Sequence, residues 1–317
     1  MGREVPRTNI TDFILLGFSD LSFPAQASLF IFFLCAYVVT LLGNGLILLM
    51  VTIDSLLHTP MYFFLRNLSF LEICFTAVIV PKAMQNFSVK CVTSFIGCAT
   101  QMYIFLAIGV CECIFLMVMA IDRYMAICQP LRYKSVMTRL LCYQLTVVCW
   151  IIGLLLSLGQ TIYVFSLPYC GSNSIAHFFC DIPPLLNIAC GNIFNNKLSV
   201  IIACMCGAVV PFILILCSYV NILSSILLIN SSQGRHKALS TCGSHLVSVL
   251  LFYGTAMLTY LRLGTEASGD KDWVITLFYY IAVPALNPLI YSLRNQDMKT
   301  ALRKLPSRIL DDVVEYW

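Results

Sequence analysis

Residues Phe95–Ile121 read FIGCATQMYIFLAIGVCECIFLMVMAI, an apolar stretch in which Glu112 is the only charged residue. A helix needs roughly 20 apolar residues to cross the hydrocarbon core of a bilayer, so this stretch is long enough to span one. The rest of the chain has the same character: 60% of its 317 residues are hydrophobic, only 11% are charged, and the mean hydropathy is +0.88. Soluble domains carry about 25% charged residues. The sequence therefore predicts a membrane protein.

Further stretches have the length of a membrane span, and together with the first they predict an all-α fold, a seven-transmembrane helix bundle. They are Leu29–Ile53, Met61–Val80, Leu140–Val164, Leu198–Ile229, Ala238–Leu261 and Trp273–Leu293. The residues before the first span are charged and contain no cleavage-like site, so we expect that span to start membrane insertion itself.

The distribution of Lys and Arg predicts the orientation of the bundle. Seven basic residues fall on the side of the N-terminus and twelve on the other side. Because basic residues accumulate in cytoplasmic segments, we expect a multi-pass plasma-membrane protein with an extracellular tail (1–28), a membrane domain (29–293) and a cytoplasmic tail (294–317). Apolar residues at helical spacing after Asn295 favour a short amphipathic helix in the inner membrane interface, with a solvated basic tail as the alternative.

Four cysteines lie on the predicted outer side, where the compartment is oxidising. Cys98 begins the third span, and Cys170, Cys180 and Cys190 lie in the long segment after the fourth. Four thiols allow three pairings. We favour Cys98–Cys180, which would tie the loop to a helix, with Cys170–Cys190, which would close the loop on itself. Cys91 is a fifth outer thiol without an assigned partner.

The sequon Asn-x-Ser/Thr occurs at Asn9, Asn67, Asn86 and Asn230. Asn67 and Asn230 fall on the predicted cytoplasmic side, and Asn86 lies close to the bilayer. We therefore expect glycosylation at Asn9 in the N-terminal tail.

Ionisable groups at membrane depth are costly and usually functional. Glu72 lies in the middle of the second span and Glu112 in the third, and Asn44, Ser69 and Asn287 lie at similar depths. Such oxygen ligands could bind a structural Na⁺ at Glu72 and Glu112. Alternatively, one carboxyl stays protonated and bonds the other, or the cluster only links the helices. No other cofactor is indicated.

Asp122–Arg123 follows the third span at its cytoplasmic end. A carboxylate that holds an arginine in one state and releases it in another would form a two-state element. An ordinary flanking charge pair is the alternative.

Prolines interrupt two of the later spans. Pro211 in the fifth span, and Pro284 and Pro288 in the seventh, remove backbone hydrogen bonds and predict kinks. Asn287-Pro288-x-x-Tyr291 therefore describes a breakable inner end of the last span.

Several short sequence motifs in the chain are recognisable. They are LLGNG (41–45), PMYFFL (60–65), MAIDRYMAIC (119–128), KALSTCGSHL (237–246), FYGT (252–255) and PALNPLIYSLRN (284–295). Together they resemble the vertebrate olfactory receptors, within the rhodopsin-like G-protein-coupled receptors, from Thr11 to about Lys304. Two positions depart from the family pattern: Ile121 stands where Tyr is usual, and Glu72 where Asp is usual. The side chain of Glu72 is one methylene longer than that of Asp, which changes the geometry expected of the ion site.

The resemblance implies a cytoplasmic switch. Its residues would be Asp122, Arg123, Tyr124, Tyr219, Lys237, His245, Asn287, Pro288 and Tyr291. Arg123 would meet the G protein, Asp122 would restrain it, and Lys237 to His245 would form the inner part of the moving sixth helix. The implied partner is the heterotrimeric stimulatory olfactory G protein, which raises cyclic AMP.

The resemblance also places a ligand pocket in the outer half of the bundle. Helical spacing from the motifs points these side chains inward: Phe105, Leu106, Gly109, Val110, Ala203, Cys204, Gly207, Tyr253, Met257, Tyr260, Thr276 and Tyr280. The lining is apolar with a few hydroxyls, which suits a small volatile odorant held mainly by apolar contact. Some of these residues could instead only pack helix against helix.

Absences narrow the ligand class. No acid stands between Gln101 and Val110, which argues against a cationic amine, and no lysine occurs in Trp273–Leu293, which excludes a retinal Schiff base. A transporter or channel for a small solute is the alternative function, but the two halves of the chain lack matched repeats. The intramembrane Glu and His residues lack the spacing of a metalloenzyme site, so we do not expect an enzyme.

Overall fold

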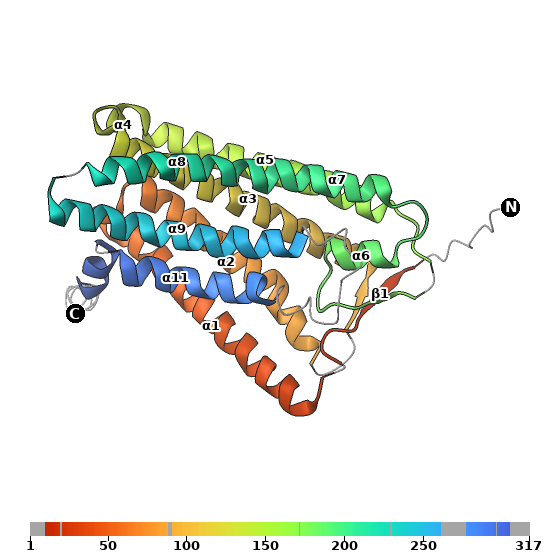
Figure 1. The fold of residues 1–317 in the computed structure, drawn as a ribbon. Coiled ribbons are helices and arrows are strands. Elements are labelled where there is room, and N and C mark those ends of the chain that lie inside the picture. Colours follow the sequence, from red (N-terminus) through yellow and green to blue (C-terminus); the bar gives the residue numbers. More distant parts are fainter. Residues whose placement is uncertain are drawn as a thin grey trace.

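The computed structural model describes residues 10–19, 21–87, 91–170, 172–228, 230–260, 277–295 and 297–304. Its long helices run side by side as a bundle (Figure 1). They are α1 (Phe23–Ile53), α2 (Pro60–Gln85), α3 (Phe95–Cys128), α5 (Arg139–Phe165), α7 (Phe194–Cys204) continued through η2 (Met205–Val209) into α8 (Val210–Leu227), α9 (Ser232–Tyr260), and η4 (Phe278–Ala282) continued into α11 (Val283–Arg294). The predicted all-α seven-helix bundle is confirmed.

Six of these described helices are long and apolar enough to cross a membrane. The seventh is a shorter apolar helix, Tyr280–Tyr291, because the predicted span Trp273–Leu293 begins among residues outside the described part of the chain. Residues 297–304 form the expected short C-terminal helix. Its Met298 and Ala301 are buried against the bundle, whereas Arg303 and Lys304 are exposed, so the helix is amphipathic.

Short elements connect the helices. They are η1 (Ser55–Leu57), α4 (Pro130–Val136) and α6 (Ile182–Ile188). Local sequence explains several helix starts. Proline at the first turn needs no hydrogen-bonded N–H, which suits Pro60 and Pro130. Ser94 and Thr138 cap the N-termini of α3 and α5 by accepting hydrogen bonds from backbone N–H groups, at 3.1 and 3.2 Å.

The expected distortions near proline take the form of π-helical turns. The wide turn η2 lies just before Pro211, and η4 lies just before Pro284. Because proline has no N–H, a carbonyl one turn upstream loses its partner, and the wider turn redistributes the remaining hydrogen bonds. Both wide turns lie in helices that surround the interior of the bundle.

A small sheet closes one end of the bundle, which we call the strand end. It contains β1 (Asp12–Leu15), β2 (Cys91–Ser94) and β3 (Ser174–Ile175) in the order β2-β1-β3. β1 pairs antiparallel with β2, with Phe13 opposite Thr93, and parallel with β3, with Leu15 opposite Ile175. Residues 12–15 lie in the predicted N-terminal tail, and no pattern in the sequence indicates this strand.

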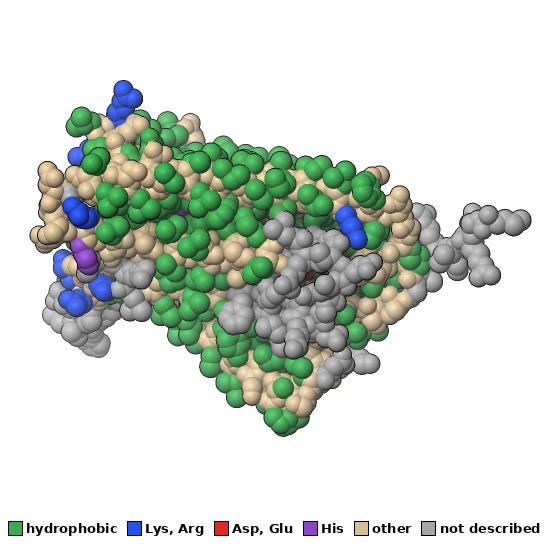
Figure 2. Space-filling view, in the orientation of Figure 1, with side chains coloured by type: hydrophobic (Ala, Val, Ile, Leu, Met, Phe, Trp, Pro, Cys, Tyr) green, Lys and Arg blue, Asp and Glu red, His purple; other side chains and the backbone are tan. Residues whose placement is uncertain are grey.

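The surface of the bundle matches a protein that spans a membrane. Figure 2 shows hydrophobic side chains over the middle of one face, and Lys and Arg gathered at the end near α4 and α11, opposite the sheet. We call this the α4 end. Two large exposed apolar side chains on α5 illustrate the middle band: Leu155 is 64% and Ile162 is 62% exposed. Exposed apolar surface on this scale is typical of a protein whose helices lie in lipid.

Candidate functional site

An apolar cavity of about 100 Å³ lies between α3, α5, η2 and α9, nearer the strand end than the α4 end. Among the residues predicted from helical spacing, those that line it are Phe105, Leu106, Gly109, Val110, Ala203, Cys204, Gly207 and Met257. Ile182 of α6 lines it from the loop side. Their role in ligand binding stays a prediction.

Two predicted pocket residues lie beside the cavity rather than in its lining. Tyr253 is fully buried, and its hydroxyl donates to the carbonyl oxygen of Cys113 at 2.8 Å, which links α9 to α3. Tyr280 is also fully buried and donates to Asp181 Oδ2 at 2.8 Å, which links η4 to the loop before α6. The side chain of Tyr260, and Thr276 as a whole, lie outside the described residues.

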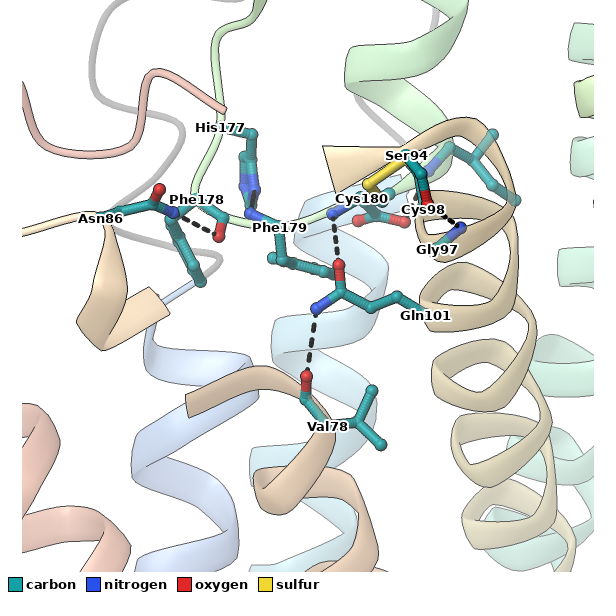
Figure 3. The surroundings of a disulfide bond; sticks show 12 residues. Val78, Asn86, Ser94, Gly97, Cys98, Gln101, His177, Phe178, Phe179 and Cys180 are labelled. Carbon is teal, nitrogen blue, oxygen red and sulfur yellow. Dashed lines mark hydrogen bonds between the residues drawn. A yellow bond between two sulfur atoms is a disulfide. The ribbon is translucent and has the colours of Figure 1, made fainter. Parts of the chain in front are cut away.

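The loop that covers the strand end is fastened by two disulfides. Cys98–Cys180 joins it to α3, and Cys170–Cys190 closes it on itself, so the favoured pairing is confirmed. Figure 3 shows how Gln101 adds a polar link beside the first bond. Its amide nitrogen donates to Val78 O at 3.0 Å, and its amide oxygen accepts from Cys180 N at 3.3 Å. The loop is thereby held to both α2 and α3.

Asn86 has a structural role at the same end. Its amide nitrogen donates to Phe178 O at 2.9 Å, as Figure 3 shows, and the residue is only 7% exposed. A glycan attached to this nitrogen would have no room at such a buried position. Asn9, the predicted glycosylation site, lies outside the described residues.

His177 is enclosed by aromatic rings of the covering loop. It stacks on Phe178, with ring centroids 4.5 Å apart, and its Nδ1 accepts from Phe179 N at 3.4 Å. Burial disfavours the charged imidazolium and lowers the pKa of His177 from 6.5 to about 4. The ring is therefore neutral at physiological pH.

The predicted polar cluster exists inside the bundle. Glu72 and Glu112 are buried and close enough to interact electrostatically, and the Asn287 amide donates to Glu72 Oε1. Among the described residues, no hydrogen-bond donor reaches three buried oxygens in this region: Asn44 Oδ1, Asn287 Oδ1 and Glu112 Oε1. Oxygen atoms without donors suit a small hard cation. Glu72 and Glu112 are only two carboxylates, and no group of three or more His, Cys, Asp or Glu able to hold a metal occurs in the described ranges.

The predicted Asp122–Arg123 pair is formed at the α4 end. Arg123 Nη2 lies 3.2 Å from Asp122 Oδ2, and Asp122 is fully buried. Tyr133 of α4 donates to Asp122 Oδ1 at 2.8 Å, a contact that sequence reasoning missed because α4 was not anticipated. The buried carboxylate also raises the pKa of the Tyr133 phenol, after the larger effect of burial itself.

A second contact links α8 to α9 at the same end. The Tyr219 hydroxyl lies 2.7 Å from His245 Nδ1 and 3.2 Å from Cys242 O. Tyr291 of α11 is buried nearby in the same core. Tyr124 is half-buried and accepts a 3.4 Å hydrogen bond from Gln129. The side chain of Lys237 lies outside the described residues.

Pro288 takes part in a close approach between α1 and α11. A Cβ atom added at Gly43 would stand 2.7 Å from Pro288 Cβ, so only glycine fits against this proline. The motifs LLGNG and PALNPLIY therefore lie on the two sides of one helix interface. Asn44 Nδ2 stands 3.5 Å from the carbonyl oxygen of Pro284 across it.

Two polar residues of the cavity lie on α5, a helix to which the sequence assigns no pocket residue. Ser157 and Gln160 of α5 line it together with Leu156. The signal in the sequence was weak, because both residues stand within a long lipid-facing span. Only the packing of α5 against α3 reveals which face of that span turns inward.

Known proteins resemble this chain over nearly its full length. A family model described as olfactory receptor matches residues 33–308. Human olfactory receptor 10AG1 is 47% identical over 300 residues, covering 94% of this chain and 99% of that protein. Mouse olfactory receptor 9S13 is 46% identical over 297 residues, covering 93% and 89%.

Among solved structures, squid rhodopsin has a similar fold. The TM-score is 0.72 at 18% sequence identity, and the match covers 90% of this chain and 81% of that one. At this identity the likeness concerns the fold alone.

Proposed function

The chain belongs to the olfactory receptor family of rhodopsin-like G-protein-coupled receptors, and on that premise we propose that it is an odorant-activated receptor for small, mainly hydrophobic volatile molecules. Members of this family are receptors and not enzymes. The observation that carries the proposal is the cavity between α3, α5, η2 and α9. Among its described lining residues none is charged, and most are apolar. Such a lining favours an uncharged ligand bound by apolar contact.

In the proposed orientation the strand end faces the extracellular side and the α4 end faces the cytoplasm. The basic side chains at the α4 end support this orientation, since Arg132, Lys134, Arg303 and Lys304 are all exposed there. The covering loop, fastened by its disulfides, would then lie over the entrance of the cavity in an oxidising compartment.

The contacts along α9 suggest how a ligand would reach the G protein. Met257 and Ala256 line the cavity, and Tyr253, one turn away, is bonded to α3. His245 lies eight residues further, about 12 Å along the helix, where it meets Tyr219. A ligand that shifts α9 at the cavity would therefore disturb the Tyr219–His245 contact beside Arg123.

Arg123 is the residue that this movement would make available to the G protein. In the described arrangement it is paired with Asp122, which Tyr133 also holds. Release from Asp122 would free the guanidinium for the stimulatory olfactory G protein, which raises cyclic AMP. This release requires that Asp122 can exchange its bonding partners, and Tyr133 is a second partner already in contact with it.

The test is a cyclic AMP assay in cells that express the receptor, the variant Arg123→Ala, and the control variant Arg132→Ala. Arg132 is an exposed arginine at the same end. We expect some members of a diverse volatile panel to raise cyclic AMP with the wild type and with Arg132→Ala. Arg123→Ala should lose the response while reaching the cell surface normally. A full response in Arg123→Ala would contradict the role of Arg123, and a volatile-evoked current without G protein would favour a channel.

We also propose that Glu72 and Glu112 bind Na⁺, supported by the donor-free oxygens of Asn44, Asn287 and Glu112. The ion would balance the charge of one of the two buried carboxyl groups and stabilise the inactive bundle. Replacing choline by sodium should raise the melting temperature of the purified receptor, and Glu112→Gln should remove this increase. Equal melting temperatures of the wild type in the two salts would refute the site.

A further inference from the structure

Ser157 is a buried hydroxyl in the wall of the cavity. It is 2% exposed, it belongs to the lining, and its Oγ has no hydrogen-bond partner among the described residues. A buried hydroxyl without a partner loses its hydrogen bonds to water and gains none in the protein. Because this hydroxyl lies in a cavity wall, a ligand bound in the cavity could supply the missing hydrogen bond.

Other hydroxyl side chains in the helices of this protein donate a hydrogen bond to a backbone carbonyl oxygen of the same helix. Ser218 donates to Leu214 O at 2.8 Å, and Thr161 donates to Ser157 O at 2.8 Å. Each bonds the carbonyl oxygen four residues earlier, the local bond that serine and threonine commonly make in helices. The Ser157 hydroxyl does not make this bond.

The other polar side chain of the lining is already satisfied. Gln160 exchanges hydrogen bonds with Ser199: its Nε2 donates to Ser199 Oγ at 3.0 Å, and its Oε1 accepts from the same hydroxyl at 3.1 Å. Gln160 therefore joins α5 to α7 and has its amide engaged. Among the described lining residues, Ser157 is left as the hydroxyl available to a ligand.

The packing of α5 fixes the direction of Ser157. One turn away on the same helix face, Gly153 touches α3 so closely that an added Cβ would stand 2.9 Å from Ala107 O. Residues four apart share a face, so Ser157 also faces α3, at the level of Phe105 and Leu106 in the cavity lining. The helices touch at Gly153 and leave room one turn further on.

From these contacts we infer that Ser157 is the polar anchor of the ligand site and selects volatile ligands that combine an apolar body with one oxygen function. The hydroxyl would donate to the oxygen of an aldehyde, ketone or ester, or exchange a hydrogen bond with an alcohol. The inference rests on the proposed function and assigns a specificity residue to its cavity. The apolar body would contact Leu106, Val110 and Met257.

The experiment compares the wild type, Ser157→Ala and the control Ser218→Ala, whose half-buried side chain lies on α8 outside the cavity lining. The probes are alcohols, aldehydes, ketones and esters of about six to ten carbons, each paired with the hydrocarbon of the same skeleton. Cyclic AMP responses give the half-maximal concentration for each agonist. Separately, the melting temperature of each purified receptor is measured without ligand.

For oxygenated agonists, we expect Ser157→Ala to raise the half-maximal concentration about tenfold, which corresponds to about 1.4 kcal/mol, the size of one hydrogen bond. Responses to the matched hydrocarbons, and all responses of Ser218→Ala, should not change. Without ligand, Ser157→Ala should melt at or above the wild-type temperature, because no internal hydrogen bond is removed.

Unchanged half-maximal concentrations for every oxygenated agonist in Ser157→Ala would overturn the anchor while leaving the receptor function in place. A lower melting temperature of unliganded Ser157→Ala would also overturn it, since the hydroxyl would then serve the fold. A wild-type receptor that reaches the surface and responds to no volatile would instead contradict the proposed function itself.

Discussion

Gly153 permits a close contact between α3 and α5, and replacing it should separate the two helices. A Cβ atom at this position would stand 2.4 Å from Cys111 Sγ and 2.9 Å from Ala107 O. The sulfur can rotate away, but the carbonyl oxygen belongs to the backbone of α3 and cannot. Overpacking of this kind costs about 1–3 kcal/mol, and the higher helix propensity of alanine returns at most about 1 kcal/mol. We expect Gly153→Ala to destabilise the receptor.

Gly159 supplies the matched control on the same helix. A Cβ there would meet nothing within 4 Å, so Gly159→Ala gains the helix propensity without a clash. The two variants should therefore differ by about 1–3 kcal/mol, or several degrees in the melting temperature of the purified receptor. Combining Gly153→Ala with Cys111→Ala should recover part of the loss, because one of the two contacts is relieved.

Equal melting temperatures for Gly153→Ala and Gly159→Ala would refute this reasoning. The result would mean that α5 can move away from α3 at little cost. It would also remove the argument that Gly153 directs the neighbouring Ser157 into the cavity.

Three further predictions concern the strand end. Cys98→Ala should block delivery to the cell surface, measured by surface labelling, because the lost bond closes a sequence separation of 82 residues and is worth about 4.5 kcal/mol in the loop-entropy model. Cys217→Ala, which removes an exposed thiol on α8, should not block delivery. Asn9→Gln should abolish the shift in gel mobility on glycosidase treatment, whereas Asn86→Gln should leave that shift intact and lower the melting temperature, since the Asn86 amide bonds Phe178 O. Acidification from pH 7 to pH 5 should destabilise the receptor by about 2 kcal/mol through His177. The folded pKa of about 4 lies below the unfolded value of 6.5, so the contribution of the neutral ring to stability is fully present above pH 6.5 and is lost as the pH falls toward 4. An equal pH dependence of the melting temperature in His177→Gln would contradict this.

The helical part of the fold was predictable because its cause is local. Lengths of apolar sequence predicted the spans, and prolines at 211 and 284 marked the helices that contain η2 and η4. The pairing of Cys98 with Cys180 followed from placing both thiols on one side of the membrane. The strands were not anticipated, because β1 joins partners about 80 and 160 residues away and each strand is too short to show a pattern.

The candidate site was only partly predictable. Helical spacing from the motifs indicated which α3 and η2 residues face the interior, and the cavity contains them. Ser157 escaped notice because nothing in its neighbours distinguishes it from Ser218. The difference between the two hydroxyls arises only when helices pack and leave one of them without an acceptor.

The central position of β1 constrains the order in which this protein can mature during synthesis. The strand leaves the ribosome before both of its neighbours, yet β3 follows the fourth long helix. Until that helix has been inserted, the early strand can pair with β2 at most and has one free edge. Quality control in the secretory pathway would therefore encounter an unfinished cap on every nascent chain, and residues 174–175 would complete it.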